Sequence, residues 1–296
     1  MAATTSASRF DLRLIVALLV VYIVWGTTYY AMRVALPAYP PFFMCALRFV
    51  LAGALLFGYT WLTGQLKITR RLLLDALVTG VLLVTLGNGL VVLAEQYVSS
   101  GIAALVISAE SVFILLLSLL YGRRVGAWQG VGVVLGLAGM LLLSAGTDLR
   151  YSPVALAALL VAAGAWAVGS IWSAYHARSE SSLSLVSVQM LVGGVVSFGV
   201  ALALGERMAI SDALAPNVAT LYLALFGSIA TFVSYNYLMR TASASLAISY
   251  AYVNPAIAFV VGCLFDEDRL TPATVLSLLA ILAGVWLIVK NEKAQH

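Results

Sequence analysis

The chain has 296 residues, of which 63% are hydrophobic and only 9% are charged, and its mean hydropathy is +1.04. Soluble domains carry about 25% charged residues, so a water-exposed chain this apolar could not cover its surface with polar groups. The composition excludes a cytosolic enzyme, a nucleic-acid-binding domain and a disordered protein. The net charge of +4 comes largely from basic residues beside apolar runs, where they orient membrane spans.

Apolar segments follow one another along the whole chain, each close to the roughly 20 residues that a helix needs to cross a bilayer. We expect all of them to be helices, because an open sheet cannot satisfy its backbone in lipid. The first segment has no clear small-residue cleavage site, so we expect it to be retained. The ten segments are 13–34, 41–63, 72–94, 99–121, 127–145, 153–175, 183–204, 217–238, 243–264 and 272–290.

The distribution of Lys and Arg predicts the orientation of these segments. With the N-terminus in the cytoplasm, eleven basic residues fall in inside segments and four in outside segments. This bias favours an even number of spans with both termini cytoplasmic. The inside residues are Arg9, Arg13, Lys67, Arg70, Arg71, Arg123, Arg124, Arg178, Arg240, Lys290 and Lys293, and the outside residues are Arg33, Arg150, Arg207 and Arg269.

The chain also matches itself at an offset of 141 to 145 residues. Residues 48–57 (RFVLAGALLF) align with 189–198 (QMLVGGVVSF), Trp25 aligns with Trp166, and the LAG at 137–139 aligns with the LAG at 282–284. A repeat of five spans enters the membrane from opposite sides in its two copies. We therefore predict an all-α membrane protein of ten transmembrane helices, built as a five-plus-five inverted repeat with halves 1–150 and 151–296. Such repeats are typical of secondary transporters, whose site lies near the midplane between the halves.

Several short motifs give the chain a resemblance to a known family: WGT at 25–27, RF at 48–49, SSGIA at 99–103, SYAYVNP at 249–255 and LTP at 270–272. The chain resembles the EamA-type ten-helix exporters of the drug/metabolite transporter superfamily over nearly its whole length. The resemblance implies an inner-membrane permease that exports amino acids or related metabolites. One position departs from the family pattern, because Glu110 and Ser111 stand where a proline matching Pro255 is expected.

Glu110 is the strongest single indication of function. Of twelve acidic residues it alone lies at the middle of a predicted span, where a charge costs about 2.5–3.5 kcal/mol on insertion scales. It would carry a proton, bind a substrate amine, or serve as a structural carboxyl that is neutral or paired with Arg48. Arg48, the basic residue well inside a span, would pair with Glu110, extend toward the interface, or bind a substrate carboxylate.

Aromatic and amide side chains lie deep in other spans, where they suit a pocket for small amphipathic solutes. Trp25, Thr28 and Tyr29 share one helix face with Met32, Pro255 frees a backbone carbonyl, and residues 87–89 (GNG) would loosen a helix. The alternatives are interfacial belts and close packing. The predicted substrate-binding residues are Trp25, Thr28, Tyr29, Asn88, Glu110, Trp166, Tyr235, Asn236, Tyr250 and Asn254.

Motifs for catalysis and for metal or nucleotide binding are missing from the sequence. It has no GxxxxGK[ST] motif, only two histidines, and one acidic cluster, at 266–268. We expect no enzyme activity, no catalytic or metal-binding residues and no cofactor.

We therefore expect a secondary transporter that exports small amphipathic metabolites, most directly amino acids, by alternating access. The alternatives are a lipid or lipid-linked-substrate flippase and, less favoured, an intramembrane enzyme. The expected partners are the lipid bilayer and a small-molecule substrate, with no nucleic acid; proton coupling stays open. We expect a monomer, although Gly132 and Gly136 form a GxxxG that would serve either packing within the chain or a dimer.

Overall fold

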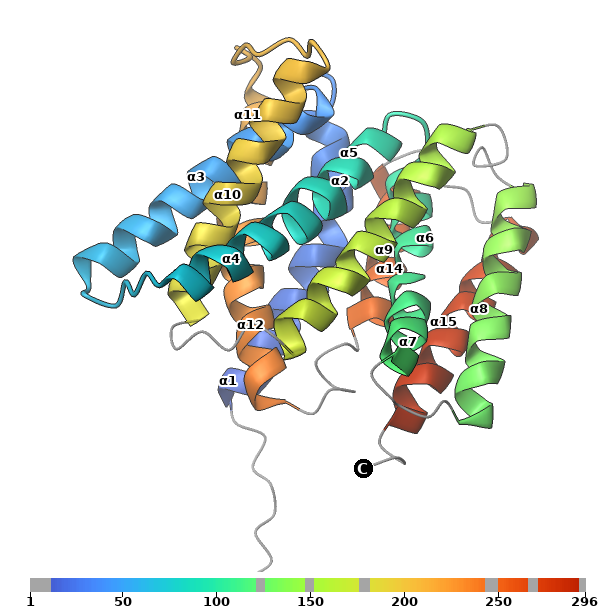
Figure 1. Cartoon of the computed structure of the whole chain (residues 1–296). Helices are drawn as coiled ribbons and strands as arrows, with labels where there is room; N and C mark the ends of the chain where they lie inside the picture. The colour runs from blue at the N-terminus through green and yellow to red at the C-terminus, as the bar shows by residue number, and fades with distance from the viewer. Residues whose placement is uncertain are drawn as a thin grey trace, which may run out of the picture.

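The computed structural model describes residues 12–120, 126–146, 152–175, 182–242, 250–265 and 271–292, and these form helices joined by short connections, with no strand (Figure 1). The acidic cluster at 266–268, both histidines and seven of the basic residues used for the orientation lie outside the described residues. The described part is therefore the all-helical protein that the composition predicts.

The helices follow the predicted spans in chain order. The first half contains α1 (Leu12–Leu19), η1 (Val20–Val24), α2 (Trp25–Ala35), α3 (Pro41–Leu62), α4 (Arg70–Thr79), η2 (Gly80–Asn88), α5 (Gly89–Ala94), α6 (Ser100–Ile107), α7 (Glu110–Leu120) and α8 (Ala127–Gly146). The second half contains α9 (Pro153–Tyr175), α10 (Ser182–Ala203), α11 (Leu214–Ala224), η4 (Leu225–Ala230), α12 (Thr231–Thr241), α14 (Tyr250–Phe265) and α15 (Pro272–Glu292).

Six of the described helical segments are long and apolar enough to cross a membrane, and large apolar side chains such as Leu62 (82% exposed) lie on their outer surfaces. Exposed apolar surface on this scale is what a bilayer covers. Shorter apolar helices occupy the other predicted spans, so the count of ten crossings stays a prediction. The six segments are Leu12–Ala35, Pro41–Leu62, Arg70–Ala94, Pro153–Ser173, Ser182–Ala203 and Leu214–Thr241.

The predicted span 99–121 is interrupted, contrary to the single helix expected there. Helix α6 ends at Ile107, and α7 begins at Glu110. At the break the Ser108 hydroxyl donates to the Leu105 carbonyl at 2.6 Å, and the amide of Ala109 bonds the carbonyl three residues back. A serine that bonds the preceding turn in this way competes with the regular helix. Glu110 therefore lies in the first turn of α7 rather than in the middle of a long helix.

Helices α3 and α10 pack against each other in opposite directions through small residues. A Cβ on Gly53 would lie 2.8 Å from the backbone nitrogen of Leu191, and one on Gly194 would lie 2.8 Å from the backbone nitrogen of Val50. These four residues form two pairs separated by 141 residues, Gly53 with Gly194 and Val50 with Leu191. The close contact is thus made twice, with the two halves exchanging roles.

Both helices also end in the same way, since Gly64 and Gly205, again 141 residues apart, both have φ +67°. A left-handed glycine at the C-terminus of a helix lets the following amide bond back to the last turn. Here Gln65 N–H donates to Thr60 at 2.9 Å, and Glu206 N–H donates to Ala201 at 2.9 Å.

Helices α8 and α15 form a second antiparallel pair at another edge of the molecule (Figure 1). A Cβ on Gly139 would lie 2.8 Å from the Ile281 side chain, and one on Gly284 would lie 2.8 Å from the Gly136 backbone nitrogen. The GxxxG of α8 therefore packs within the chain, and its residues correspond to those of α15 at an offset of 145.

Candidate functional site

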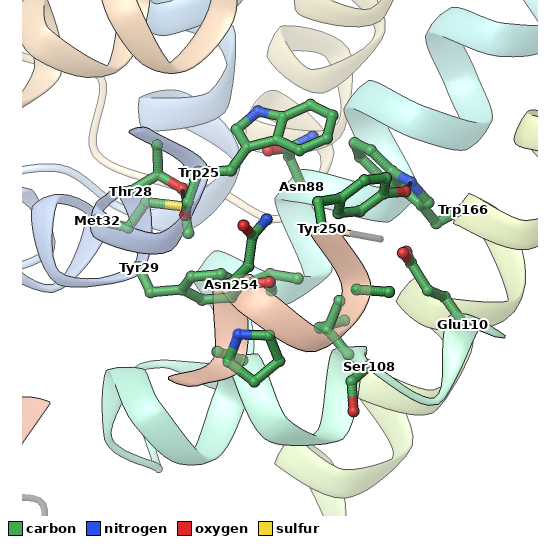
Figure 2. A pocket seen from close by; sticks show the side chains of 15 residues that line it. Trp25, Thr28, Tyr29, Met32, Asn88, Ser108, Glu110, Trp166, Tyr250 and Asn254 are labelled. Atoms are coloured by element: carbon green, nitrogen blue, oxygen red, sulfur yellow. Dashed lines mark hydrogen bonds between the residues drawn. The ribbon is translucent and has the colours of Figure 1, made fainter. Parts of the chain in front are cut away.

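Between these two pairs lies a cavity lined by helices of both halves (Figure 2). Its empty space, with the open solvent at its mouth included, amounts to about 560 Å³. Its lining residues on α2 and on η2–α5 lie toward the C-terminal ends of the segments Leu12–Ala35 and Arg70–Ala94. These ends lie on the side of the molecule opposite Leu12 and Glu292, the first and last described residues (Figure 1). Its lining residues are Trp25, Thr28, Tyr29, Met32, Asn88, Val91, Ala104, Ile107, Ser108, Glu110, Trp166, Tyr250, Ala251, Asn254 and Pro255.

A chain of hydrogen bonds crosses the cavity wall from the second half to the first. The indole nitrogen of Trp166 donates to the Tyr250 hydroxyl at 3.2 Å, and that hydroxyl hydrogen-bonds the Glu110 carboxyl. Glu110 is buried at 3% exposure. A buried carboxyl held by a tyrosine hydroxyl can be positioned for a proton or for the donor groups of a ligand.

Asn254 has a different environment in the same cavity. Its side chain is 6% exposed, and its Oδ1 atom has no hydrogen-bond partner among the described residues. Figure 2 shows the amide pointing into the space between Trp25, Tyr29 and Tyr250. Since a buried acceptor without a donor costs about 1–3 kcal/mol, this atom is suited to accept a hydrogen bond from a bound molecule.

An aromatic cluster, composed of Trp25, Trp166, Phe232, Tyr235 and Tyr250, closes one side of the cavity. The Trp25 ring lies 5.1 to 5.7 Å from each of the other four. Such edge-to-face contacts stabilise large rings beyond the area that they bury. Because the cluster takes rings from both halves, a relative movement of the halves has to rearrange it.

Arg48 joins the halves beside the cavity through neutral partners. Its guanidinium donates to the Ser228 hydroxyl at 2.8 Å, the Gly227 carbonyl at 2.7 Å and the Asn88 side-chain oxygen at 3.3 Å. At 2% exposure it does not extend toward the interface. The carbonyl that it binds belongs to η4, whose wide π turns interrupt the regular α-helical hydrogen bonds. Pairing with Glu110 is not among its contacts, so that interpretation is not supported.

The structure brings together most of the predicted site residues. Eight of the ten line the cavity. Tyr235 lies in the aromatic cluster, with its hydroxyl 3.4 Å from the Ser170 hydroxyl. Asn236 does not line the cavity; its side chain donates to the Phe232 carbonyl at 3.1 Å.

Ser108 and the small and apolar lining residues of α5, α6 and α14 were not predicted from the sequence. Ser108 lies at the break between α6 and α7, just before Glu110. The sequence at this break contains no proline or glycine that would predict an interruption of the helix. Ala251 is one turn before Pro255, the residue whose missing N–H was the available signal in the sequence.

A second, more open hollow of about 950 Å³ lies between α3, α10 and the η4–α12 segment. It is lined by apolar residues apart from Tyr59 and Ser234. It offers no charged group, so it provides little for the recognition of a polar solute. Its lining residues are Leu55, Leu56, Tyr59, Leu183, Ile229, Ala230, Val233 and Ser234.

Comparison with known proteins decides the family. The model of the EamA-like transporter family matches residues 12–145 and, separately, residues 153–290. The chain belongs to the EamA-like transporter family. It is therefore a membrane transporter of the drug/metabolite transporter superfamily, as the motifs predicted.

Two bacterial relatives agree with this assignment. The chain is 37% identical over 275 residues to the uncharacterized inner membrane transporter YedA of Escherichia coli, covering 92% of this chain and 89% of that protein. It is 25% identical to the uncharacterized transporter YvbV of Bacillus subtilis, with 94% and 93% covered. Together with the apolar helices, these relatives identify an inner-membrane protein with several spans.

A solved structure shows the same fold. A crystal structure of another protein matches with a TM-score of 0.68 over 96% of this chain and 98% of that one, at 21% identity.

Proposed function

We propose that this protein is a secondary transporter that exports small amphipathic metabolites, most directly amino acids, by alternating access. The observation that carries the proposal is the cavity itself, which is central and lined by aromatic rings, the buried Glu110 carboxyl and the open acceptor of Asn254. Pockets for small molecules combine a mostly apolar lining with a few placed polar groups in this way.

Alternating access requires two halves that can exchange roles. We propose ten membrane crossings in two inverted units, 1–150 and 151–296, with both termini cytoplasmic. The proposal is supported by the two separate family matches and by the corresponding close contacts between helices. Gly53 contacts Leu191 as Gly194 contacts Val50, and Gly139 contacts Ile281 as Gly284 contacts Gly136. The wide turns η2 and η4 begin 145 residues apart, at Gly80 and Leu225.

In this mechanism the ten predicted site residues have four roles. The rings of Trp25, Tyr29 and Trp166 contact the apolar part of the solute. Thr28, Asn88, Tyr250 and Asn254 provide polar contacts, while Glu110 carries the proton that couples export to a pH gradient. Tyr235 and Asn236 act from behind the aromatic cluster.

Efflux from proteoliposomes tests this function. Vesicles containing the protein are loaded with a mixed pool of amino acids, and release is followed with and without a pH gradient, against protein-free vesicles. We expect amino acids to leave faster than from protein-free vesicles. The absence of flux for every amino acid would contradict the proposal, and scrambling of a labelled lipid in the same vesicles would favour the flippase.

Glu110→Gln separates coupling from transport in the same assay. If Glu110 carries the proton, the variant loses gradient-driven efflux but retains exchange of solute across the membrane. Normal gradient-driven efflux by the variant would exclude Glu110 as the proton carrier and leave transport itself intact.

A further inference from the structure

The chemistry of the cavity wall specifies which end of a substrate is recognised. Two residues that line the cavity carry oxygen acceptors: the buried Asn254 Oδ1 atom, which has no donor among the described residues, and the Glu110 carboxyl, which receives a hydrogen bond from Tyr250. No Lys, Arg or His is among the described residues that line the cavity. The wall therefore offers two oxygen acceptors and no basic group to whatever binds there, together with the hydroxyls of Thr28, Tyr29, Ser108 and Tyr250.

The guanidinium of Arg48, beside the cavity, does not add hydrogen-bond donors for a ligand. Arg48 lies behind Asn88 and directs its N–H groups to Asn88, Ser228 and the Gly227 carbonyl. Asn88 in turn donates from its amide nitrogen to the Leu83 carbonyl at 2.8 Å. The donors on this side of the cavity are thus occupied within the protein, and a ligand carboxylate gains no ready partner from them.

The aromatic lining points to the same kind of ligand. Trp25, Tyr29, Trp166 and Tyr250 all line the cavity with Asn254 and Glu110. Aromatic faces attract cations within about 6 Å, and an ammonium group has three N–H donors and no acceptor. An ammonium group therefore matches the rings, the carboxyl and the open amide oxygen at once.

We propose that the site selects its substrates by a primary amine, which the Asn254 Oδ1 atom and the Glu110 carboxyl accept, and that a substrate carboxylate is not required. Asn254 is then a specificity-determining residue, and simple amines are ligands alongside amino acids. The inference rests on the proposed function for its transport role, but the recognition can be measured as binding alone.

The test is a binding titration of the purified full-length protein in detergent, by calorimetry, with four probes that share a phenyl group. Phenethylamine has the amine alone, phenylalanine has both groups, and N-acetylphenylalanine and 3-phenylpropionate lack the basic amine. We expect the first two to bind with affinities within about fivefold of each other and the last two to bind at least tenfold more weakly. Equal or tighter binding of 3-phenylpropionate would overturn the inference.

Variants assign the effect to the residue. Asn254→Leu should weaken phenethylamine binding at least tenfold, because it removes the acceptor, while Asn254→Asp, which keeps an acceptor of similar size, should retain binding. The matched control is Gln65→Leu, which removes an exposed amide outside the cavity and should leave binding unchanged. If Asn254→Leu does not fold, the decision rests on Asn254→Asp, and loss of amine binding in that folded variant would count against the proposal.

The outcomes for recognition and for transport are separable. Amine binding without any efflux from proteoliposomes would contradict the proposed export function and leave the proposed amine recognition intact. Efflux of amino acids that is unchanged in Asn254→Leu would preserve the transporter and remove Asn254 from its specificity.

Discussion

Helices α3 and α10 contact each other through corresponding glycines, whereas the polar groups at corresponding positions of the two halves differ. Arg48 of the first half corresponds to Gln189 of the second, and Glu110 corresponds to Pro255. Arg48 is hydrogen-bonded across to η4, while the Gln189 Nε2 atom is buried without a partner among the described residues. The halves therefore share positions that set packing and diverge at positions that carry charge.

A second difference lies between two equivalent helix crossings that join the halves. Helix α4 contacts α9 at one crossing, and α11 contacts α2 at the other. The Trp172 indole donates to the Asp75 carboxylate at 3.1 Å, and Asp75 is buried. The corresponding residues at the other crossing are Ala31 on α2 and Thr220 on α11, and the Thr220 hydroxyl donates within its own helix, to the Pro216 carbonyl. One crossing between the halves thus has a polar contact between helices that its counterpart lacks.

The largest effect is expected from removing the charge that joins the halves. Arg48→Gln introduces into the first half the residue type found at the corresponding position 189 of the second half. The variant loses the charge-assisted hydrogen bonds of Arg48, which should lower the free energy of unfolding by about 2–3 kcal/mol. The measurement is thermal unfolding in detergent. Gln189→Leu is the matched control, and it should be neutral or slightly stabilising because it removes a buried unsatisfied amide. Equal stability of Arg48→Gln and the wild type would refute the role of Arg48 in joining the two halves.

The next effect tests the shared packing. Gly53→Ala and Gly194→Ala should each cost about 1–3 kcal/mol, because each added Cβ meets backbone atoms at 2.8 Å. Gly58 and Gly199, also 141 residues apart, have open space at their Cβ positions. Alanine there should be neutral or stabilising by up to about 1 kcal/mol. A large difference between Gly53→Ala and Gly194→Ala in thermal unfolding would break the correspondence between the halves.

A smaller effect is expected at the unequal crossing. Trp172→Phe keeps a ring but loses the donor to Asp75, which should cost about 1–2 kcal/mol. Thr220→Val, at the position corresponding to Asp75, should change stability by a few tenths of a kcal/mol, since its bond is within one helix. Urea titrations of both variants give the comparison, and similar losses would show that the two crossings are equally dependent on polar contacts.

The smallest effect concerns the helix ends. Glu206 accepts hydrogen bonds from the amides of Phe42 and Phe43 at the start of α3, at 3.2 and 2.7 Å. Glu206→Gln should cost about 0.5–1 kcal/mol through the loss of charge at a helix N-terminus. At the corresponding junction, where α3 ends and α10 begins, the Ser184 hydroxyl donates to the main-chain carbonyl of Gln65. Because this bond does not use the Gln65 side chain, Gln65→Ala should leave the melting temperature unchanged. A loss in Gln65→Ala as large as that in Glu206→Gln would contradict this difference.

The sequence was sufficient to predict the helical membrane fold, because composition and apolar segment length respond directly to the bilayer. It also predicted the α2 face of the cavity, since Trp25, Thr28 and Tyr29 follow the helical period. It did not distinguish Asn254 from Asn236. Both lie on helices rich in tyrosine, and only the rotation of each helix decides which amide faces the cavity.

Two further features required the three-dimensional structure. The break at Ser108 arises from a side-chain bond to the preceding turn, which serines in many regular helices also make. Two partners of Arg48, Gly227 and Ser228, belong to a π segment 179 and 180 residues away, and sequence spacing gives no information on which groups such a segment presents.

The most direct test of alternating access measures distances at both ends of the molecule. In a background without Cys45 and Cys263, spin labels are placed at Leu73 on α4 and Val168 on α9, and in a second protein at Tyr30 on α2 and Val218 on α11. Electron–electron resonance in lipid then records each distance with and without a transported amino acid. The account predicts that one distance lengthens while the other shortens. Two unchanged distances, or two that change in the same direction, would contradict it.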